Sequence, residues 1–278
     1  MSNKGGKKDK SSPRQNRTDL FKPDFSPHKP VHPLGCDPLH GPSLPKHIVI
    51  ILGVGPGLGI SIAQVFASRG YITASSPEAK IDCEKLSAAF ACDALNNESI
   101  ASAVQEVAAH WKDKKIGTAC YNASIRKRGP FLEQRLDQIK EAVQGSILGR
   151  FSFAQAVLRQ MEKGGEGGSL LVTGATSSTR GREGFAGFAA SKSGLRAMCP
   201  SIAREYGPKS IHVAHVIVDG LFESDTVLEY LGMPKGSRFP DGSALLPPQM
   251  AKTWPFLAQQ HQSNWTFEMD LRPAREHW

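Results

Sequence analysis

In the sequence ILGVGPGLGISIA, the glycines Gly53, Gly57 and Gly59 separate an apolar run from an amphipathic one. A chain needs glycine at such positions if it turns sharply out of a strand, approaches a pyrophosphate with its backbone and packs a helix tightly on that strand. The N-terminus of the following helix would offer unpaired N–H groups and a partial positive charge to the phosphates. The same pattern occurs in purely structural turns, but its place between a strand and a helix favours dinucleotide binding.

The sequence around this loop predicts strands that alternate with helices. HIVIILG is an uninterrupted apolar run, as in strands buried on both faces, and GISIAQVFASRG has an apolar face and a terminal glycine. Alternating elements imply a parallel, doubly wound α/β sheet of the Rossmann type with right-handed crossovers. We expect further strands at YITAS, AAFACDA, IGTACYNAS, GSLLVTGA, SIHVAHVIVDG and WTFEMDL. We expect helices over about 99–111, 132–161 with an interruption near Gly145, 187–206 and 248–260, and only a brief one between the second and third strands.

Length and composition fit a single domain that follows an N-terminal extension. Residues 1–46 are rich in Lys, Ser and Pro and have no periodic apolar face. We therefore expect them to be disordered and then extended, and we expect one domain over residues 47–278. From residue 221 the sequence is irregular and rich in Pro and Gly, and we expect it to form a substrate loop and a C-terminal segment. The ending NWTFEMDLRPAREHW would close the substrate cleft or form a subunit interface.

Most of the net charge of +8 lies in the N-terminal extension, because residues 1–22 hold seven Lys or Arg against two Asp and so carry +5. Such a segment can attract anionic surfaces or act as a targeting signal, although most basic tails are simply solvated. We expect no nucleic-acid partner. No apolar run approaches the roughly 20 residues that span a bilayer, and the N-terminus lacks the apolar region of a secretory signal. We expect neither membrane insertion nor secretion.

The five cysteines are scattered and form no C-x-x-C pair. This usage favours a reducing compartment, the cytoplasm, in which the thiols are small core residues. We expect no metal site.

Several further motifs follow the glycine loop in order, and together they resemble the short-chain dehydrogenase/reductase family. The loop has the family's spacing G-x-x-x-G-x-G, YNAS resembles its N-N-A-G, FAASKSGL resembles its Y-x-x-x-K helix, and HVIVDG stands where its P-G follows the sixth strand. The resemblance covers about residues 46–220 and implies NAD(P)(H), a small-molecule substrate and a homo-oligomer (dimer or tetramer). It places the cofactor contacts at Gly53, Gly57, Leu58, Gly59, Asp93, Ala94, Asn122, Ala123, Lys192 and Gly220.

The end of the second strand bears on the choice between NAD and NADP. A carboxylate at this point usually hydrogen-bonds the ribose 2′-OH of NAD, whereas a nearby arginine suits the 2′-phosphate of NADP. This chain has Ser75 and Ser76 there, followed by Glu78 and Lys80, whose charges oppose each other. The absence of an acid at the strand end gives a slight preference for NADP(H).

The resemblance places the family's catalytic Asn, Ser, Tyr and Lys on Ser146, Ala175, Phe188 and Lys192, so only the lysine is retained. In the family the tyrosine is the general acid/base, the lysine activates it and holds the nicotinamide ribose, the serine polarises the carbonyl, and the asparagine anchors a water. Phe188 cannot donate a proton, a loss on the order of 10²–10⁴ in rate. The missing carbonyl donor would account for a further factor on the order of 10²–10³, although such losses need not add.

Neighbouring side chains could replace the lost groups. A small loop shift could bring the hydroxyl of Thr176, Ser177 or Ser178 to a substrate carbonyl, and Tyr121 could reach the cleft from another wall. Each of these side chains also has an ordinary role as a solvated or packed residue.

Three charged residues also stand near the expected cleft. Asp219 replaces the family's proline beside the nicotinamide pocket, and Arg180 and Arg182 lie in the loop over the site, where they could bind an anionic substrate. Surface arginines of this kind are more often only solvated.

Three functions are compatible with this sequence. The first is an NAD(P)-dependent oxidoreductase of divergent mechanism that acts on a small or medium organic carbonyl or alcohol. The second is a non-redox enzyme on the same fold, an isomerase, dehydratase or cyclase. The third is a nucleotide-binding protein without turnover. The retained glycines and Lys192 favour nucleotide binding, and the three lost groups argue against ordinary dehydrogenase kinetics.

Overall fold

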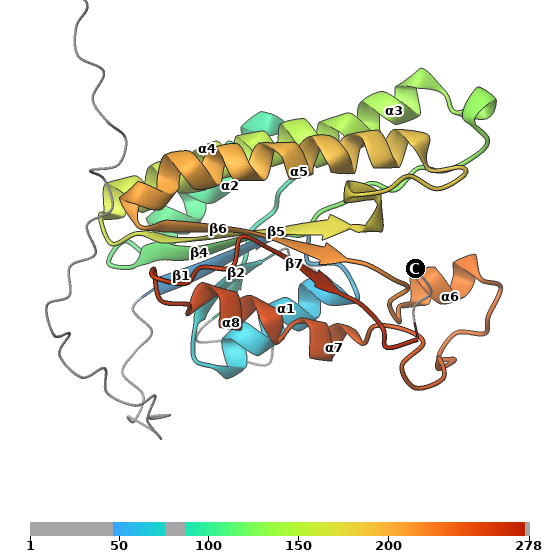
Figure 1. Cartoon of the computed structure of the whole chain (residues 1–278). Helices are drawn as coiled ribbons and strands as arrows, with labels where there is room; N and C mark the ends of the chain where they lie inside the picture. The colour runs from blue at the N-terminus through green and yellow to red at the C-terminus, as the bar shows by residue number, and fades with distance from the viewer. Residues whose placement is uncertain (1–46, 76–86, 276–278) are drawn as a thin grey trace, which may run out of the picture. The chain divides into compact units, whose positions relative to one another are not determined.

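The computed structural model describes residues 47–75 and 87–275. The expected N-terminal extension and the connection that contains Ser76, Glu78 and Lys80 lie outside these ranges. The described residues form a seven-stranded, entirely parallel sheet in the order β3-β2-β1-β4-β5-β6-β7 (Figure 1). The predicted fold, a single Rossmann-like domain with a doubly wound sheet, is confirmed.

The strands are short and buried at the centre of the sheet. The bounds of the strands are β1 His47–Leu52, β2 Ile72–Ser75, β3 Ser87–Ala89, β4 Lys115–Tyr121, β5 Gly168–Ala175, β6 Ile211–Val218 and β7 Glu268–Leu271. Every residue of β6 is buried, and so are most of those in β1, β4 and β5. This burial on both faces explains why these strands are continuous apolar runs in the sequence.

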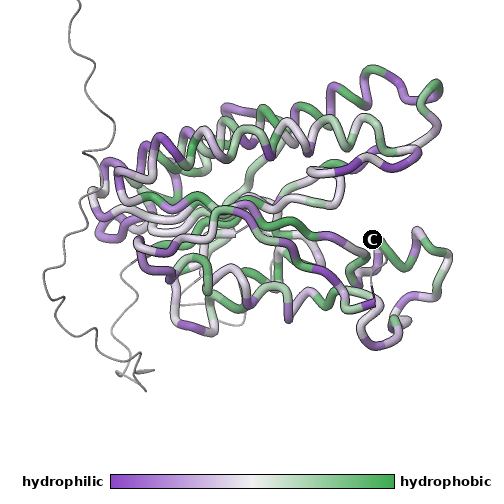
Figure 2. Tube along the Cα trace, viewed as in Figure 1, coloured by the Kyte–Doolittle hydropathy of each residue, from purple (hydrophilic) through white to green (hydrophobic). Residues whose placement is uncertain are grey.

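Helices cover both faces of the sheet (Figure 1). One face carries α2 (Asn97–His110), α4 (Gly149–Gly164) and α5 (Ala186–Tyr206), with α3 (Leu136–Val143) at the start of α4. The other face carries α1 (Leu58–Ser68), α7 (Pro247–Met250) and α8 (Thr253–Ala258). Each face has its own apolar core, and Figure 2 shows apolar stretches in the strands and in the helices on both sides of them.

The predicted interruption near Gly145 is a π-helical turn, Gln144–Leu148, between α3 and α4. Turns of this kind occur inside longer helices and often at functional sites. The third strand is shorter than AAFACDA predicts, because it ends at Ala89, and Asp93 therefore lies in the connection to α2. The predicted helix over 248–260 is divided into α7 and α8, and α6 (Asp225–Tyr230) was not predicted.

Within the ranges 47–75 and 87–275, no helix combines the length and the apolar character needed to cross a membrane.

The core on the α1 side depends on a single large side chain in α8. Trp254 is fully buried, whereas Phe256, two residues later, is 55% exposed. We expect Trp254→Ala to lower the free energy of unfolding by about 3–5 kcal/mol, because it leaves a cavity in the packed layer. Phe256→Ala is the matched control and should change it by less than about 0.5 kcal/mol. Urea unfolding followed by circular dichroism measures both, and equal losses would contradict this packing.

Candidate functional site

The glycine loop after β1 is packed against the end of β4. The N–H groups of Asn122 and Ala123 both donate to the carbonyl oxygen of Leu52, at 2.8 and 3.1 Å, and the Asn122 amide donates to the carbonyl oxygen of Gly53 at 2.8 Å. Gly53 has a φ of 93°, and a Cβ on it would lie 2.2 Å from the backbone nitrogen of Ala123. A Cβ on Gly59 would lie 2.2 Å from the carbonyl oxygen of Gly53. Both positions therefore require glycine.

The opposite side of the loop is open. A Cβ on Gly55 would meet no atom within 4 Å. Gly57 has a φ of 132° and is the N-cap of α1, which begins at Leu58. The first N–H groups of a helix have no partner inside the helix and bind anions well. The loop thus combines an open backbone surface with a helix N-terminus, as a pyrophosphate requires.

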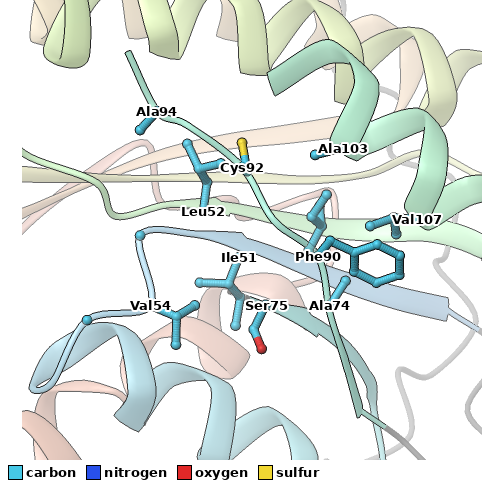
Figure 3. A pocket seen from close by; sticks show the side chains of 13 residues that line it. Ile51, Leu52, Val54, Ala74, Ser75, Phe90, Cys92, Ala94, Ala103 and Val107 are labelled. Atoms are coloured by element: carbon cyan, nitrogen blue, oxygen red, sulfur yellow. The ribbon is translucent and has the colours of Figure 1, made fainter. Parts of the chain in front are cut away.

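A pocket of about 200 Å³ begins beside this loop (Figure 3). It is lined mainly by apolar side chains, and Gly53, Ser75 and Ala94 lie at three points of its wall. Pockets that hold a whole small molecule measure roughly 300–1,000 Å³, so this one suits a single ring of a dinucleotide. Ser75 is buried at the end of β2, and no carboxylate of the described residues lines the pocket.

Asp93 and Gly220, two further expected cofactor contacts, lie at the same edge of the sheet. The carboxylate of Asp93 accepts a hydrogen bond from the backbone of Leu95 at 2.9 Å, which shapes the turn that leads to Ala94. Gly220, with a φ of 151°, follows β6. Since all strands are parallel, the loops after their carboxyl ends gather at one edge, where ligands of such sheets bind.

The retained lysine lies next to the phenylalanine that replaces tyrosine. The Lys192 Nζ is 5.7 Å from the centre of the Phe188 ring and donates a weak hydrogen bond to the carbonyl oxygen of Thr173 at 3.4 Å. Both side chains are buried. Burial, together with the nearby cation of Arg150, holds the pKa of Lys192 well below its usual range. Ser146 is also buried, in the π turn, and its hydroxyl bonds no group of the described residues.

The candidate replacement hydroxyls differ in their surroundings. Thr176 is half-buried, next to Ala175 at the end of β5, and its hydroxyl bonds none of the described residues. Ser177 and Ser178 are buried, and the hydroxyl of Ser178 accepts a hydrogen bond from the backbone of Ala175 at 3.1 Å. Thr176 is therefore the better placed of the three to meet a substrate.

Tyr121 is occupied elsewhere. Its hydroxyl is fully buried and donates to the carbonyl oxygen of Gly145 at 2.6 Å. Burial raises the pKa of Tyr121 to about 12. This placement does not favour Tyr121 as a proton donor to a substrate.

Asp219 forms part of an ion-pair cluster rather than a free carboxylate in the cleft. It is fully buried and pairs with Arg180 at 3.2 Å and with Arg272 at 2.9 Å. Arg272 also pairs with Asp270 at 2.7 Å. The cluster joins the loop after β5, the end of β6 and the C-terminal segment. Arg180, expected as a possible ligand of an anionic substrate, is already paired with Asp219 in this cluster. Arg182 is exposed.

The segment around α6 lies near the glycine loop. A Cβ on Gly57 would lie 3.7 Å from the Phe222 ring and 3.8 Å from the Ser224 Cβ. From the other side, the Arg128 guanidinium stacks on the Tyr230 ring at 3.6 Å from its centre. These contacts place the segment after β6 near both the glycine loop and the loop after β4.

Sequence reasoning missed several buried basic residues, among them Arg150 and His215. Both positions can be recognised in the sequence pattern. Arg150 occupies the apolar stripe of α4 together with Phe153, Val157 and Met161, and His215 stands in a strand without an exposed residue. When the apolar periodicity of a helix or strand assigns a position to the core, a charged or polar residue at that position indicates a special environment.

Within the part of the chain that the structure describes, no group of three or more His, Cys, Asp or Glu side chains could hold a metal ion.

Comparisons with known proteins agree with this geometry. The family model described as short chain dehydrogenase matches residues 47–230. The 3-oxoacyl-(acyl-carrier-protein) reductase FabG of Pseudomonas aeruginosa is 24% identical over 206 residues, which cover 70% of this chain and 81% of that protein.

Two solved structures are similar over nearly their whole length. A short-chain dehydrogenase from Rhodopseudomonas palustris is 30% identical, with a TM-score of 0.67, and the match covers 82% of this chain and 99% of that one. A 3-ketoacyl-(acyl-carrier-protein) reductase from Brucella melitensis, complexed with NADH, is 20% identical, with a TM-score of 0.73 and coverage of 84% and 99%. The second likeness concerns the fold alone.

The pairing of Glu268 predicts a pH dependence of stability. Arg196 donates to Glu268 at 2.7 and 2.8 Å, and His215 lies 2.9 Å from it. The hydrogen bonds from Arg196, and then that from His215, lower the pKa of Glu268 from 4.5 to about 2. A lowered carboxyl pKa stabilises the fold above the unfolded value, and this contribution is lost as the pH falls through the folded value.

We therefore expect Glu268→Gln to be less stable than the wild type at neutral pH. The difference should shrink as the pH falls from 4.5 towards 2, where Glu268 itself takes up a proton. Urea unfolding across this range measures it, with the exposed Glu229→Gln as control. A difference that does not depend on pH would show that the charge of Glu268 is unimportant.

Proposed function

Because the chain belongs to the short-chain dehydrogenase family, we propose that it is an NAD(P)-dependent oxidoreductase that acts on the carbonyl or alcohol group of a small or medium organic molecule. The observation that carries the proposal is the glycine loop. Gly53 and Gly59 lack the space for a side chain on the side of β4, while Gly55 faces open space. A loop that is tight on one side and open on the other is what a pyrophosphate needs.

The residues present fit the dinucleotide. Gly53, Gly57, Leu58 and Gly59 would hold the pyrophosphate, Asp93 and Ala94 the adenine end, and Asn122, Ala123, Lys192 and Gly220 the nicotinamide ribose end. When bound, NAD(P)(H) supplies the hydride acceptor or donor. The chain itself must position the substrate and move a proton.

The proposed cofactor is NADP(H) in preference to NAD(H). Ser75 ends β2 without a carboxylate, so no acid of the described residues repels a 2′-phosphate there. The similar reductase from Brucella melitensis was complexed with NADH, so the preference needs its own measurement.

The mechanism must differ from that of a tyrosine-dependent enzyme. Phe188 offers a ring and no proton, and Ala175 offers no hydroxyl. Thr176 is the hydroxyl best placed to polarise a carbonyl, because it follows Ala175 directly and is half-buried. A non-redox reaction in the same cleft is the second candidate, favoured by the absence of functional groups at Ala175 and Phe188.

The remaining parts of the proposal concern assembly and location. Leu148 and Phe151, at the start of α4, are 46% and 50% exposed. Apolar side chains at such positions suit contact with a second copy, and we propose a homo-oligomer through α4 and α5. We propose a cytoplasmic location from the cysteine usage alone.

One glycine of the loop and one outside it form a matched pair that tests nucleotide binding. At a hundredfold excess over Kd, NADPH should stabilise the wild type by about 2.7 kcal/mol, a rise in Tm of roughly 5–10 °C. Gly59→Ala should lose this rise, because its Cβ would lie 2.2 Å from the carbonyl oxygen of Gly53. Gly207→Ala should keep it, because Gly207 follows α5, away from the loop, and a Cβ there would meet no atom within 4 Å. A full rise in folded Gly59→Ala would contradict the assigned loop.

Restoring the lost groups tests the redox assignment. We expect Phe188→Tyr with Ala175→Ser to create or raise NADPH-dependent reduction of carbonyl compounds, by a factor of up to roughly 10²–10⁴ if the tyrosine regains its role. Phe185→Tyr with Ala175→Ser is the control, since the Phe185 ring lies 6.3 Å from that of Phe188. NADPH oxidation against a panel of aldehydes and ketones is the assay.

A folded double variant that binds NADPH and gains no activity would mean that the cleft is shaped for a different reaction.

A further inference from the structure

Three basic side chains are buried together between the sheet and the helices α4 and α5, which cover it in Figure 1. They are Arg150 of α4, Lys192 of α5 and His215 of β6, with exposed fractions of 0, 2 and 0%. A buried cation without a partner is strongly destabilising, so such groups are normally paired or lose their charge. The question is which of the three keeps its proton.

Arg150 keeps its charge. Its guanidinium lies 4.2 Å above the centre of the Tyr121 ring, and none of its three nitrogens bonds any group of the described residues. Burial lowers the pKa of Arg150 to about 10, which is still well above neutral pH. Tyr121 cannot neutralise it, because burial raises the phenol pKa to about 12. The layer between the sheet and the helices α4 and α5 thus contains one permanent positive charge. Its stabilising contact among the described residues is the cation–π contact with Tyr121.

His215 is neutral. Its Nδ1 lies 2.9 Å from Glu268, whose charge is already shared with Arg196. Its Nε2 is buried and bonds none of the described residues, and a Cβ on Gly174 would lie only 2.2 Å from it. Burial lowers the pKa of His215 despite the carboxylate. With the proton on the side of Glu268, Nε2 carries a lone pair directed towards the interior.

Lys192 has no carboxylate partner among the described residues. Its Nζ has one long hydrogen bond to the Thr173 carbonyl oxygen, at 3.4 Å. Burial first, and then repulsion by Arg150, lower the pKa of Lys192. Arg150 of α4 and His215 of β6 interact with it electrostatically, and the next titratable groups are Tyr121 and Cys199 beside Arg150 and Glu268 beside His215. Burial raises the pKa of Cys199 to about 11, so this thiol is no counter-anion.

We propose that burial without a carboxylate partner, reinforced by the positive charge of Arg150, keeps Lys192 uncharged in the resting protein, and that the Lys192 amine exchanges the proton that Phe188 cannot. This inference rests on the proposed function. In the oxidative direction, the amine takes the hydroxyl proton of the alcohol while the hydride of the same carbon passes to the nicotinamide. In the reductive direction, the ammonium returns its proton to the alkoxide oxygen as the hydride adds to the carbonyl carbon. Arg150 acts through Lys192 and is a positioning residue.

The amine is suited to this role by its place on α5. Lys192 lies one helical turn from Phe188, the position from which the tyrosine would act, and no hydroxyl separates it from the ring. A general base is most effective when its pKa lies near the working pH, and an ordinary exposed lysine is far above it.

The charge of Lys192 is measured in the full chain without cofactor. Protein labelled with ¹³C at the lysine Cε is examined by NMR at neutral pH, and the Lys192 resonance is assigned by its loss in Lys192→Gln. We expect one lysine at the chemical shift of an uncharged amine and all others at that of an ammonium. A wild-type spectrum in which every lysine resonance is that of an ammonium overturns the proposal. This outcome can be recognised without the Lys192→Gln variant.

The role of Arg150 is tested in the same way. In Arg150→Met, which keeps the length of the side chain and removes its charge, the Lys192 resonance should move towards the ammonium position, because the repulsion is removed while the burial of the amine remains. Arg150→Gln is a second charge-free variant, and Arg159→Met, on the exposed side of α4, should leave the resonance unchanged. A Lys192 resonance that does not move in either folded charge-free variant overturns the role of Arg150.

Two further outcomes separate this inference from its alternatives. If added chloride converts Lys192 from amine to ammonium, the cluster is an anion site and the proposal is overturned. If Lys192 is charged while NADPH still raises the Tm of the wild type, the inference fails and the proposed function stands.

Discussion

The contact between the backbones of Gly53 and Ala123 joins the two strands between which the cleft opens. β1 lies between β2 and β4, and the strand order reverses at this point, as it does wherever doubly wound sheets bind ligands. The Asn122 amide secures the contact through the Gly53 carbonyl oxygen. Because the loop is fixed on this side, its free backbone and the start of α1 face outward, and the pocket that contains Ser75 and Ala94 begins beside it.

The side of the sheet covered by α4 and α5 carries the residues at the expected catalytic positions. α5 carries Lys192 one helical turn after Phe188, and β5 ends at Ala175. The family resemblance assigns Phe188 and Ala175 to the positions of the proton donor and of the hydroxyl that polarises a carbonyl. The surrounding layer is unusual instead for its buried positive charge, from Arg150, which no anion of the described residues balances. Burial of charge on this scale destabilises a fold, and such groups cluster at functional sites.

The sequence predicts the sheet well because each central strand is a buried apolar run, and it predicts the glycine loop because only glycine satisfies the backbone contacts at Gly53 and Gly59. It predicts the end of β3 poorly, since FACDA continues an apolar pattern beyond Ala89 where pairing stops. It does not show that Tyr121 bonds Gly145 or that Asp219 joins two arginines, because these contacts link segments far apart in the chain. Arg150 is visible as a break in the apolar stripe of α4, but its lack of a partner is not.

The central claim is that this chain still holds a nicotinamide dinucleotide although its tyrosine is gone. Titration of the purified wild type with NADPH and with NADH, followed by cofactor fluorescence, tests it most directly. The account predicts saturable binding at micromolar concentration, with NADPH bound more tightly than NADH. Absence of binding for both would mean that the glycine loop is only a structural turn, and it would contradict the account.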